Sequence, residues 1–361
     1  MKSSSVIKKR NSGIELLRII LILCVILMHY IERGGGQYNN VGFNYDCLLF
    51  IECACVGAVD AFILISGYYL CKTSKRTLIK PLKLLLMVAI IRVAHYVLTS
   101  LRSGNVIDVS VLLPMLIPHN WFLILYIALY FISPLFNVVF KYLTKTLVKR
   151  FLLVAIILFS VWTTSWDTFL NAFSLDTNWM STIGMYGDQR GYNIVNFCLM
   201  YCIGAYIRIY GIENKYSATK LILVVILLIF AIFGWSLIYK IFTGRVVQIP
   251  RYYCSPLVIL LATSVFLLFA KKSFHSAIIN CLSRATFMVF ITHEYFFTFL
   301  PIDMITALNP ILMILIIICM ACVLYLAGFI VYVLYSIVEI PLFKMLCKLC
   351  PCLSKDIYYN E

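Results

Sequence analysis

Long apolar runs separated by short polar segments dominate the chain and set the first expectation about its fold. A bilayer-spanning helix needs about 20 predominantly apolar residues, and runs of roughly that length recur along the whole sequence. Because an open sheet cannot pair its backbone in lipid, these runs predict helices. We expect an all-α integral membrane protein with about ten transmembrane helices. The predicted spans are 13–30, 47–71, 81–101, 120–140, 151–166, 195–212, 221–242, 253–270, 285–302 and 310–335.

Composition agrees with this expectation. Hydrophobic residues make up 63% of the chain and charged residues 12%, whereas a soluble domain has about 25% charged residues. The longest segment between predicted spans, 167–193, is too short for an independent domain. It is long enough to cap a pore on the outer side. We therefore predict a single polytopic domain over residues 1–361. Basic residues precede the first span, but no cleavage site follows, so we interpret it as an uncleaved span.

The distribution of cations predicts the orientation. Lys and Arg residues concentrate in the N-terminal tail and in alternate loops, such as the segments around Lys72, Lys145 and Lys271. By the positive-inside rule these segments face the cytoplasm, and both termini lie there as well. The net charge of +15 then reflects topology and an attraction to anionic membrane lipid. The basic loops lack interleaved aromatic residues, so we predict no nucleic-acid binding.

The fourteen cysteines do not predict a metal site. Most lie inside predicted spans, where cysteine acts as a small apolar residue. The tail contains Cys347-x-x-Cys350-Pro-Cys352, but a second ligand pair at zinc-finger spacing is missing. The sequence also lacks P-loop, GxSxG and HExxH motifs. We expect no bound metal.

Arg18 and His29 interrupt the first apolar span. Eleven positions of a helix rotate about 1100°, close to three full turns, so both side chains share a face about 16 Å apart along the axis. Ionisable residues in a span usually face the protein interior or a wet cavity. A cation near one membrane face and a titratable base deeper in the bilayer suggest a channel that holds an anionic ligand. The alternative is that Arg18 snorkels to the headgroups and His29 is interfacial.

The second span and the loop after it hold further polar residues. Asp60 lies in apolar sequence and needs a partner. Ser66-Gly67 permits local unwinding or, alternatively, close helix packing. Lys75, Arg76 and Lys80 precede Pro81 at the start of the next span, an arrangement that suits phosphate binding. Positive-inside topology alone would also explain these cations.

Two later spans carry candidate residues as well. Trp121 begins the fourth span at the outer interface, as in an aromatic belt, and Tyr126 and Tyr130 share a helix face. His293 lies deep in the ninth span and is followed by Glu294. This pair is either a satisfied structural pair or part of a functional site.

Taken together, these segments resemble the acyltransferase 3 family of integral-membrane acyltransferases, and they occur in the family's order across nearly the whole chain. Tyr126 stands where many members carry Glu, and Phe62-Ile63 replaces a Phe pair, so an acidic role at position 126 is not expected. No soluble esterase-like domain is appended. The matching segments are Arg18-x10-His29, Val59-Asp60-Ala-Phe-Ile-Leu-Ile-Ser66-Gly67-Tyr68, Trp121-Phe-Leu with Tyr130 and Pro134, Tyr201-Cys-Ile-Gly204-Ala, and Ser283-Arg-Ala-Thr-Phe-Met-Val-Phe-Ile-Thr-His293.

The resemblance implies transfer of an acyl group, usually acetyl, from cytoplasmic acyl-coenzyme A to a hydroxyl of a cell-surface or lipid-linked glycan. It implies a bacterial cytoplasmic membrane protein in which acyl-coenzyme A is a substrate and no cofactor is permanently bound. His29 would act as general base or as nucleophile, with Asp60 orienting it. The expected donor-binding residues are Arg18, Ser66, Gly67, Lys75, Arg76 and Lys80, and the expected substrate-binding residues are Trp121, Tyr126, Tyr130 and His293, with Trp121 stacking on sugar rings.

Two other classes of function remain compatible with the residues alone. The chain could be a transporter of a glycan or lipid precursor, in which the same polar residues line a translocation path. It could also be a membrane scaffold or sensor, in which they serve helix packing. Acyl-coenzyme A cleavage or acyl transfer by the purified protein distinguishes an enzyme from both.

Overall fold

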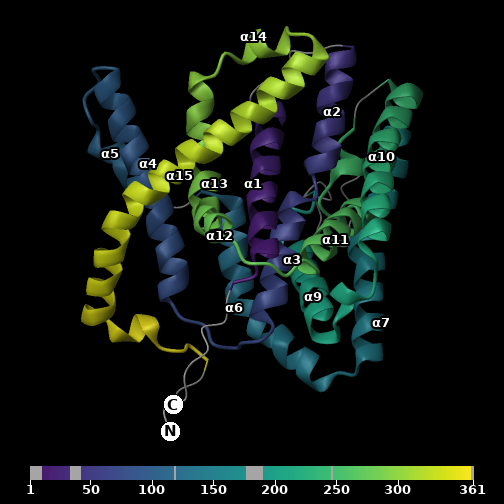
Figure 1. The fold of residues 1–361 in the computed structure, drawn as a ribbon, viewed down its shortest axis with the longest axis horizontal. Coiled ribbons are helices and arrows are strands. Elements are labelled where there is room, and N and C mark those ends of the chain that lie inside the picture. The colour runs from purple at the N-terminus through teal and green to yellow at the C-terminus, as the bar shows by residue number, and fades with distance from the viewer. Residues whose placement is uncertain (1–9, 33–41, 118, 176–189, 245–246, 359–361) are drawn as a thin grey trace.

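A computed structural model describes residues 10–32, 42–117, 119–175, 190–244 and 247–358, and within these residues the chain forms helices without a β-strand (Figure 1). The predicted all-α fold is confirmed. Eight helical segments of this described part are long and apolar enough to cross a membrane. They are Ser12–Glu32, Phe43–Leu70, Ile79–Arg102, Trp121–Tyr142, Lys145–Ala172, Ala218–Thr243, Ile249–Ala270 and Pro310–Leu349. The protein is therefore a multi-pass membrane protein.

The individual α-helices follow the predicted spans with several subdivisions. Short 3₁₀ or π segments join some of them, at Ile157–Trp162, Ile212–Asn214, Ile249–Arg251, Ser283–Ala285, Phe297–Phe299 and Pro351–Ser354. The α-helices are α1 (Ser12–Glu32), α2 (Phe43–Cys55), α3 (Ala58–Leu70), α4 (Ile79–Arg102), α5 (Val109–Met115), α6 (Trp121–Tyr142), α7 (Lys145–Ile156), α8 (Thr163–Ala172), α9 (Ile194–Tyr210), α10 (Ala218–Thr243), α11 (Pro256–Ala270), α12 (Ala277–Leu282), α13 (Thr286–Phe296), α14 (Ile302–Thr306) and α15 (Pro310–Leu349).

Helix α1 is the central element of the bundle. It packs against α2, α3 and α11 and also against α13 and α15, and Figure 1 shows it between these two groups. Its apolar side chains Ile14, Leu17, Ile26 and Ile31 are fully buried. A helix that is apolar nearly all round is stable only when it is enclosed in this way. Arg18 and His29 are therefore carried on a helix that contacts both groups of neighbouring helices.

Two predicted spans are not single helices. The second is divided at Val56-Gly57 into α2 and α3, and the ninth, predicted over 285–302, consists of α13 with a 3₁₀ turn at each end. Helix α13 has 11 residues, which is about 16 Å, so it cannot cross a 30 Å hydrocarbon core alone. Irregular backbone at this depth is tolerated where it lines a cavity within the protein, and the segment around α13 does so.

Helices α3 and α9 cross at unusually close range. A Cβ added to Gly67 of α3 would overlap the carbonyl group of Tyr201 in α9. A Cβ added to Gly204 of α9 would overlap the carbonyl group of Leu64 in α3. Small residues let helix backbones approach in this way in membranes. Of the two interpretations of Ser66-Gly67, the structure shows close packing at Gly67.

Segments that the cation pattern assigns to the cytoplasm contact one another. The backbone N–H of Ile357, near the C-terminus, donates to the Arg76 carbonyl at 2.9 Å, and the N–H of Ser12 donates to the Phe274 carbonyl at 3.0 Å. On the opposite side, helix α8 extends through Asp167 to Ala172. This shortens the predicted outer segment 167–193, and residues 176–189 of that segment lie outside the described residues.

Candidate functional site

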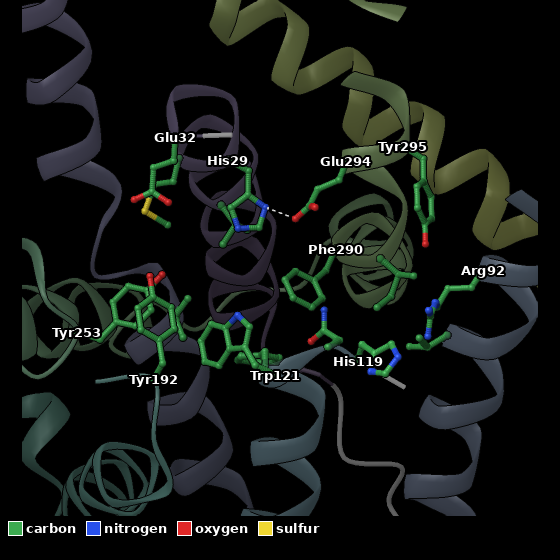
Figure 2. A pocket seen from close by; sticks show the side chains of 17 residues that line it. His29, Glu32, Arg92, His119, Trp121, Tyr192, Tyr253, Phe290, Glu294 and Tyr295 are labelled. Carbon is green, nitrogen blue, oxygen red and sulfur yellow. Dashed lines mark ion pairs between the residues drawn. The ribbon is translucent and has the colours of Figure 1, made fainter. Parts of the chain in front are cut away.

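Two adjoining cavities lie beside α1, and the first contains His29. This cavity, which we call the His29 cavity, has a volume of about 320 Å³. Figure 2 shows its histidine, carboxylate and aromatic side chains gathered around one space. Its walls come from α1, α3, α4, α6 and α13 and from the segments before α9 and α11. The lining residues are Val25, Met28, His29, Glu32, Val59, Val88, Arg92, His119, Asn120, Trp121, Phe122, Tyr192, Tyr253, Phe290, Ile291, Glu294 and Tyr295.

The second cavity, the Arg18 cavity, has a volume of about 280 Å³ and is more apolar. Its two cations are Arg18 of α1 and Arg284 of the 3₁₀ turn before α13. Because α1 is one continuous helix, Arg18 and His29 face adjoining cavities, as their spacing predicts. The lining residues are Arg18, Ile22, Val25, Val59, Phe62, Ile65, Ser66, Leu84, Phe122, Tyr126, Ser283, Arg284, Thr286, Phe287 and Phe290.

His29 belongs to a three-residue cluster with His293 and Glu294 of α13. Its Nδ1 lies 2.8 Å from Nε2 of His293 and 2.9 Å from Oε1 of Glu294, the ion pair drawn in Figure 2. The two imidazole rings stack with their centroids 4.9 Å apart. His293 is fully buried, whereas the His29 side chain is 17% exposed. His29 is thus the histidine that faces the cavity, and His293 lies behind it.

The hydrogen-bond partners assign the protons on these rings. Nδ1 of His293 lies 3.0 Å from the carbonyl oxygen of Val289, which can only accept, so this nitrogen carries the proton of the neutral ring. Nε2 of His293 is then an acceptor, and Nδ1 of His29 donates to it. The lone pair of neutral His29 therefore lies on Nε2, and this atom has no hydrogen-bond partner among the described residues.

The same three side chains are the candidate metal ligands of the described chain. Their ligand atoms lie within 4.8 Å of one another. The separations of 2.8 and 2.9 Å are those of hydrogen bonds, whereas two nitrogen ligands of a tetrahedral zinc ion lie about 3.3 Å apart. The geometry thus fits a hydrogen-bonded relay better than a metal centre.

Asp60 does not orient His29, so this prediction is corrected. The Asp60 carboxylate is fully buried and its Oδ1 accepts a hydrogen bond from Nδ2 of Asn196 in α9 at 3.0 Å. Its Oδ2 has no partner among the described residues. The carboxylate that reaches His29 is Glu294, one position after His293. Asp60 instead links α3 to α9.

Arg18 lines the Arg18 cavity, but its guanidinium is paired with a carboxylate of its own helix. Its Nη1 donates to both carboxylate oxygens of Glu15, at 3.0 and 3.1 Å. Its side chain remains 30% exposed and lies 5.8 Å from the ring centroid of Tyr69. Arg284, which is exposed, supplies a second cation to the same cavity. An anion in this cavity would therefore meet two guanidinium groups.

The remaining predicted donor residues divide into two groups. Ser66 lines the Arg18 cavity, with its hydroxyl donating to the Phe62 carbonyl at 3.1 Å. Gly67 does not line it, because it is the packing position against Tyr201. Lys75, on the loop before α4, and Lys80, in the first turn of α4, are exposed and lie outside the walls of both cavities. The predicted donor set is thus only partly brought together.

Arg76 is a buried structural residue, and its guanidinium binds backbone carbonyls and Ser133 rather than solvent. It is fully buried, and its Nε donates to the Tyr130 carbonyl at 2.8 Å. Pro134 has no N–H to give that carbonyl its usual helical partner, so Arg76 satisfies it. Nη1 donates to the carbonyls of Thr73 and Lys75, and Nη2 donates to Ser133. These bonds occupy all three guanidinium nitrogens, which corrects the predicted phosphate contact.

Of the predicted substrate-binding residues, only Trp121 lines the His29 cavity. Its ring contacts Tyr192 and Tyr253, with centroids 4.6 and 6.3 Å away. Tyr126 lines the Arg18 cavity instead. The hydroxyl of Tyr130 accepts a hydrogen bond from the Thr77 N–H at 2.9 Å, so Tyr130 anchors the loop before α4. His293 is buried behind His29. Tyr130 and His293 line neither cavity, so the expectation that they contact substrate directly is corrected, whereas substrate contact by Tyr126 stays a prediction.

Several residues that line the His29 cavity were not predicted from the sequence. Arg92 was detectable, because it is an ionisable residue within the apolar span 81–101. It lines the His29 cavity, and its Nη1 donates to the Ile117 carbonyl. Glu32, His119, Tyr192 and Tyr253 lie at span ends or in loops, where polar and aromatic residues are ordinary. No sequence pattern distinguished them.

Comparisons with known proteins agree with this arrangement. The chain matches a family described as an acyltransferase domain over residues 11–333, which is nearly its whole length. Neither the curated proteins nor the solved structures give a match. The matched range contains both cavities and the cluster of His29, His293 and Glu294. The chain therefore belongs to the acyltransferase 3 family and is an acyltransferase.

Proposed function

We propose that the protein transfers a short acyl group, usually acetyl, from cytoplasmic acyl-coenzyme A to a hydroxyl of a glycan at or beyond the outer membrane face. The observation that carries this proposal is Nε2 of His29, which has no hydrogen-bond partner among the described residues and belongs to a cavity with aromatic and polar walls that adjoins a second cavity with two arginines. Each cavity suits one of the two substrates.

The Arg18 cavity suits the donor. Coenzyme A is a polyanion at its nucleotide end and carries a long uncharged arm that ends in the thioester. Arg18 and Arg284 would hold a phosphate by charge-assisted hydrogen bonds. The apolar walls formed by Ile22, Phe62 and Phe287 would accommodate the arm. The thioester would then reach the level of His29 at the end of the arm.

The His29 cavity suits a sugar. Trp121, Tyr192 and Tyr253 offer ring faces and edges, and aromatic rings pack well against the apolar faces of amphipathic groups. Glu32, Arg92 and Asn120 add polar groups on the same walls. A bound sugar would thus find both stacking surfaces and hydrogen-bond partners. Its reacting hydroxyl would lie against His29.

The reaction follows from the assigned protons. Nε2 of neutral His29 accepts the proton of the sugar hydroxyl as the oxygen attacks the thioester carbon. The carbon–sulfur bond then breaks, and the proton on Nε2 passes to the leaving thiolate, giving an ester and free coenzyme A. Glu294 stabilises the transient imidazolium, while His293 holds the ring through Nδ1. His29 is unchanged at the end of the cycle.

Glycan mass spectrometry of cells that produce the protein tests this function. Cells producing the wild type should contain glycans with an added acyl mass that cells without the protein lack. The variant His29→Gln should abolish the modification at equal membrane abundance. His275→Gln is a matched control, because His275 is an exposed histidine outside both cavities, and it should retain the modification. A glycan that is exported but never acylated would instead support a transporter.

A further inference from the structure

Hydrogen-bond donors that the proposed reaction does not use line one side of the His29 cavity. They are Arg92 of α4, His119 of the segment before α6, and Tyr295 of α13. Figure 2 shows these three residues on the side of the cavity away from Glu32, with the Tyr295 hydroxyl directed toward Arg92. We call them the Arg92 wall.

Arg92 is a cation within an apolar helix and has no acidic partner. It is half-buried and lies thirteen positions after Ile79, the first residue of α4. Its Nη1 donates to the Ile117 carbonyl, and no carboxylate of the described residues forms an ion pair with it. Its Nε and Nη2 have no hydrogen-bond partner in the described part of the chain. Because an ionisable group in a span is costly and typically marks a substrate path, these N–H groups are candidates for contact with a ligand.

The hydrogen bond from Arg92 also keeps His119 close to the guanidinium. His119 follows Ile117 by two residues, and two residues extend at most about 7 Å. The imidazole is exposed and has no hydrogen-bond partner among the described residues. Helix α6 begins at Trp121 directly afterwards, and the first N–H groups of a helix add partial positive charge. Arg92 and His119 thus present donors to the same part of the cavity.

Tyr295 is held beside Arg92 by a neighbouring ring of α4. The ring centroids of Tyr295 and His95 lie 4.0 Å apart, and the two planes differ by 15°. His95 and Arg92 are three positions apart on α4, so they share a helix face. The Tyr295 hydroxyl lines the cavity without a hydrogen-bond partner among the residues that the structure describes. It can therefore donate to a ligand that the guanidinium binds.

The carboxylates of the cavity lie elsewhere on its walls. Glu294 is 2.9 Å from Nδ1 of His29, and Figure 2 shows Glu32 across the cavity from Arg92. Guanidinium groups bind carboxylates and phosphates by charge-assisted hydrogen bonds. A sugar with one anionic group would therefore bind in a single orientation, with its anion at Arg92 and a hydroxyl toward His29.

We propose that Arg92, His119 and Tyr295 form a subsite for an anionic group of the acceptor, either a carboxylate or a phosphate. This inference rests on the proposed glycan acceptor and adds its chemical class, an acidic glycan. Removing a charge-assisted hydrogen bond typically weakens binding about tenfold or more. We therefore expect Arg92→Gln to raise the KM for the acceptor by that factor and to leave the KM for acetyl-coenzyme A unchanged.

Neutralising the acceptor tests the subsite. Purified protein in lipid vesicles receives labelled acetyl-coenzyme A and a glycan-containing membrane extract in three portions. One portion is untreated, one has its carboxylates converted to methylamides, and one has its sugar–phosphate linkages cleaved by mild acid. Wild-type transfer should fall in the portion that has lost the bound anion, which identifies the anion as carboxylate or phosphate. In that portion the wild type and Arg92→Gln should transfer at equal rates, which a purely structural role of Arg92 would not produce.

Arg102→Gln is the matched control, because Arg102 is an exposed arginine of α4 that lines neither cavity. It should behave as the wild type with every portion. Arg92→Lys keeps the positive charge and should retain part of the preference for the untreated portion, which provides a second test if Arg92→Gln does not fold.

Two results would overturn the inference while the proposed function stands. One is wild-type transfer, abolished by His29→Gln, that is equal with all three portions. The other is a folded Arg92→Gln protein with the wild-type KM for the untreated acceptor. Acyl transfer that survives His29→Gln would instead overturn the proposed function.

Discussion

The substitution Gly67→Ala examines the close crossing of helices α3 and α9. The added Cβ would lie 2.8 Å from the carbonyl carbon and 3.0 Å from the Cα of Tyr201, and closer still to its carbonyl oxygen. Unstrained carbon atoms approach to about 3.5–4.0 Å. Because the obstructing atoms are backbone, no side-chain rotation relieves the overlap. Helices α3 and α9 must separate locally by roughly 0.5–1 Å.

A separation of that size removes about a quarter to a half of the attractive energy of each affected dispersion contact. Overpacking in a close-packed interior typically costs about 1–3 kcal/mol. Alanine regains up to about 1 kcal/mol over glycine through its helix propensity, which offsets part of that cost. We therefore expect Gly67→Ala to lower the free energy of unfolding by about 1–2 kcal/mol.

Thermal unfolding of the purified protein in detergent measures the effect. Gly234→Ala is the matched control, because a Cβ there meets no atom within 4 Å, so this variant should equal or exceed the wild-type melting temperature. Gly67→Ala should melt several degrees below the wild type. If Gly67→Ala is as stable as the wild type while Gly234→Ala behaves as expected, the close crossing of α3 and α9 is wrong.

Four further predictions follow from individual contacts. Arg18→Ala should raise the KM for acyl-coenzyme A about tenfold or more, since a charged hydrogen bond contributes about 1.5–3 kcal/mol, and leave the acceptor KM unchanged; equal donor affinity would reject this role. Glu294→Gln keeps an acceptor for the His29 N–H but removes its charge, so kcat should fall about tenfold in steady-state assays. Arg76→Ala should lower the melting temperature without changing donor KM, because it removes the buried guanidinium and its hydrogen bonds to Tyr130, Ser133, Thr73 and Lys75. An impermeant thiol reagent should label Asp176→Cys but not Lys355→Cys in intact cells, and labelling of the C-terminal position would refute cytoplasmic termini.

The sequence predicted those parts of the fold that depend on apolar run length. All ten predicted spans contain a helix, because lipid leaves the backbone few alternatives. The break in the ninth span was not predictable. The hydrophobic pattern continues through 285–302, and only the three-dimensional structure shows that this segment lines cavities. Helix α15 also continues past its predicted end at Tyr335. It reaches Leu349 and contains Pro341.

The candidate site was predictable where one helix carried the information. Arg18 and His29 lie on one continuous helix, so their spacing alone determines their shared face. Contacts between helices could not be derived in this way. The partner of His29 is Glu294 rather than Asp60, because the relative depth of α1, α3 and α13 depends on packing. Likewise, Arg76 resembles any loop cation in sequence, and its burial depends on contacts with Tyr130 and Ser133 of α6 that only the folded chain provides.

The most direct test of the account is the rate of acyl transfer by purified His29→Gln protein in lipid vesicles. Labelled acetyl-coenzyme A is the donor and a glycan-containing membrane extract is the acceptor, with donor binding measured in parallel. If Nε2 of His29 is the base, transfer should fall about 10²–10⁴-fold while donor binding stays near the wild-type value and His275→Gln remains active. Transfer by His29→Gln at a near-wild-type rate would contradict the central role of His29.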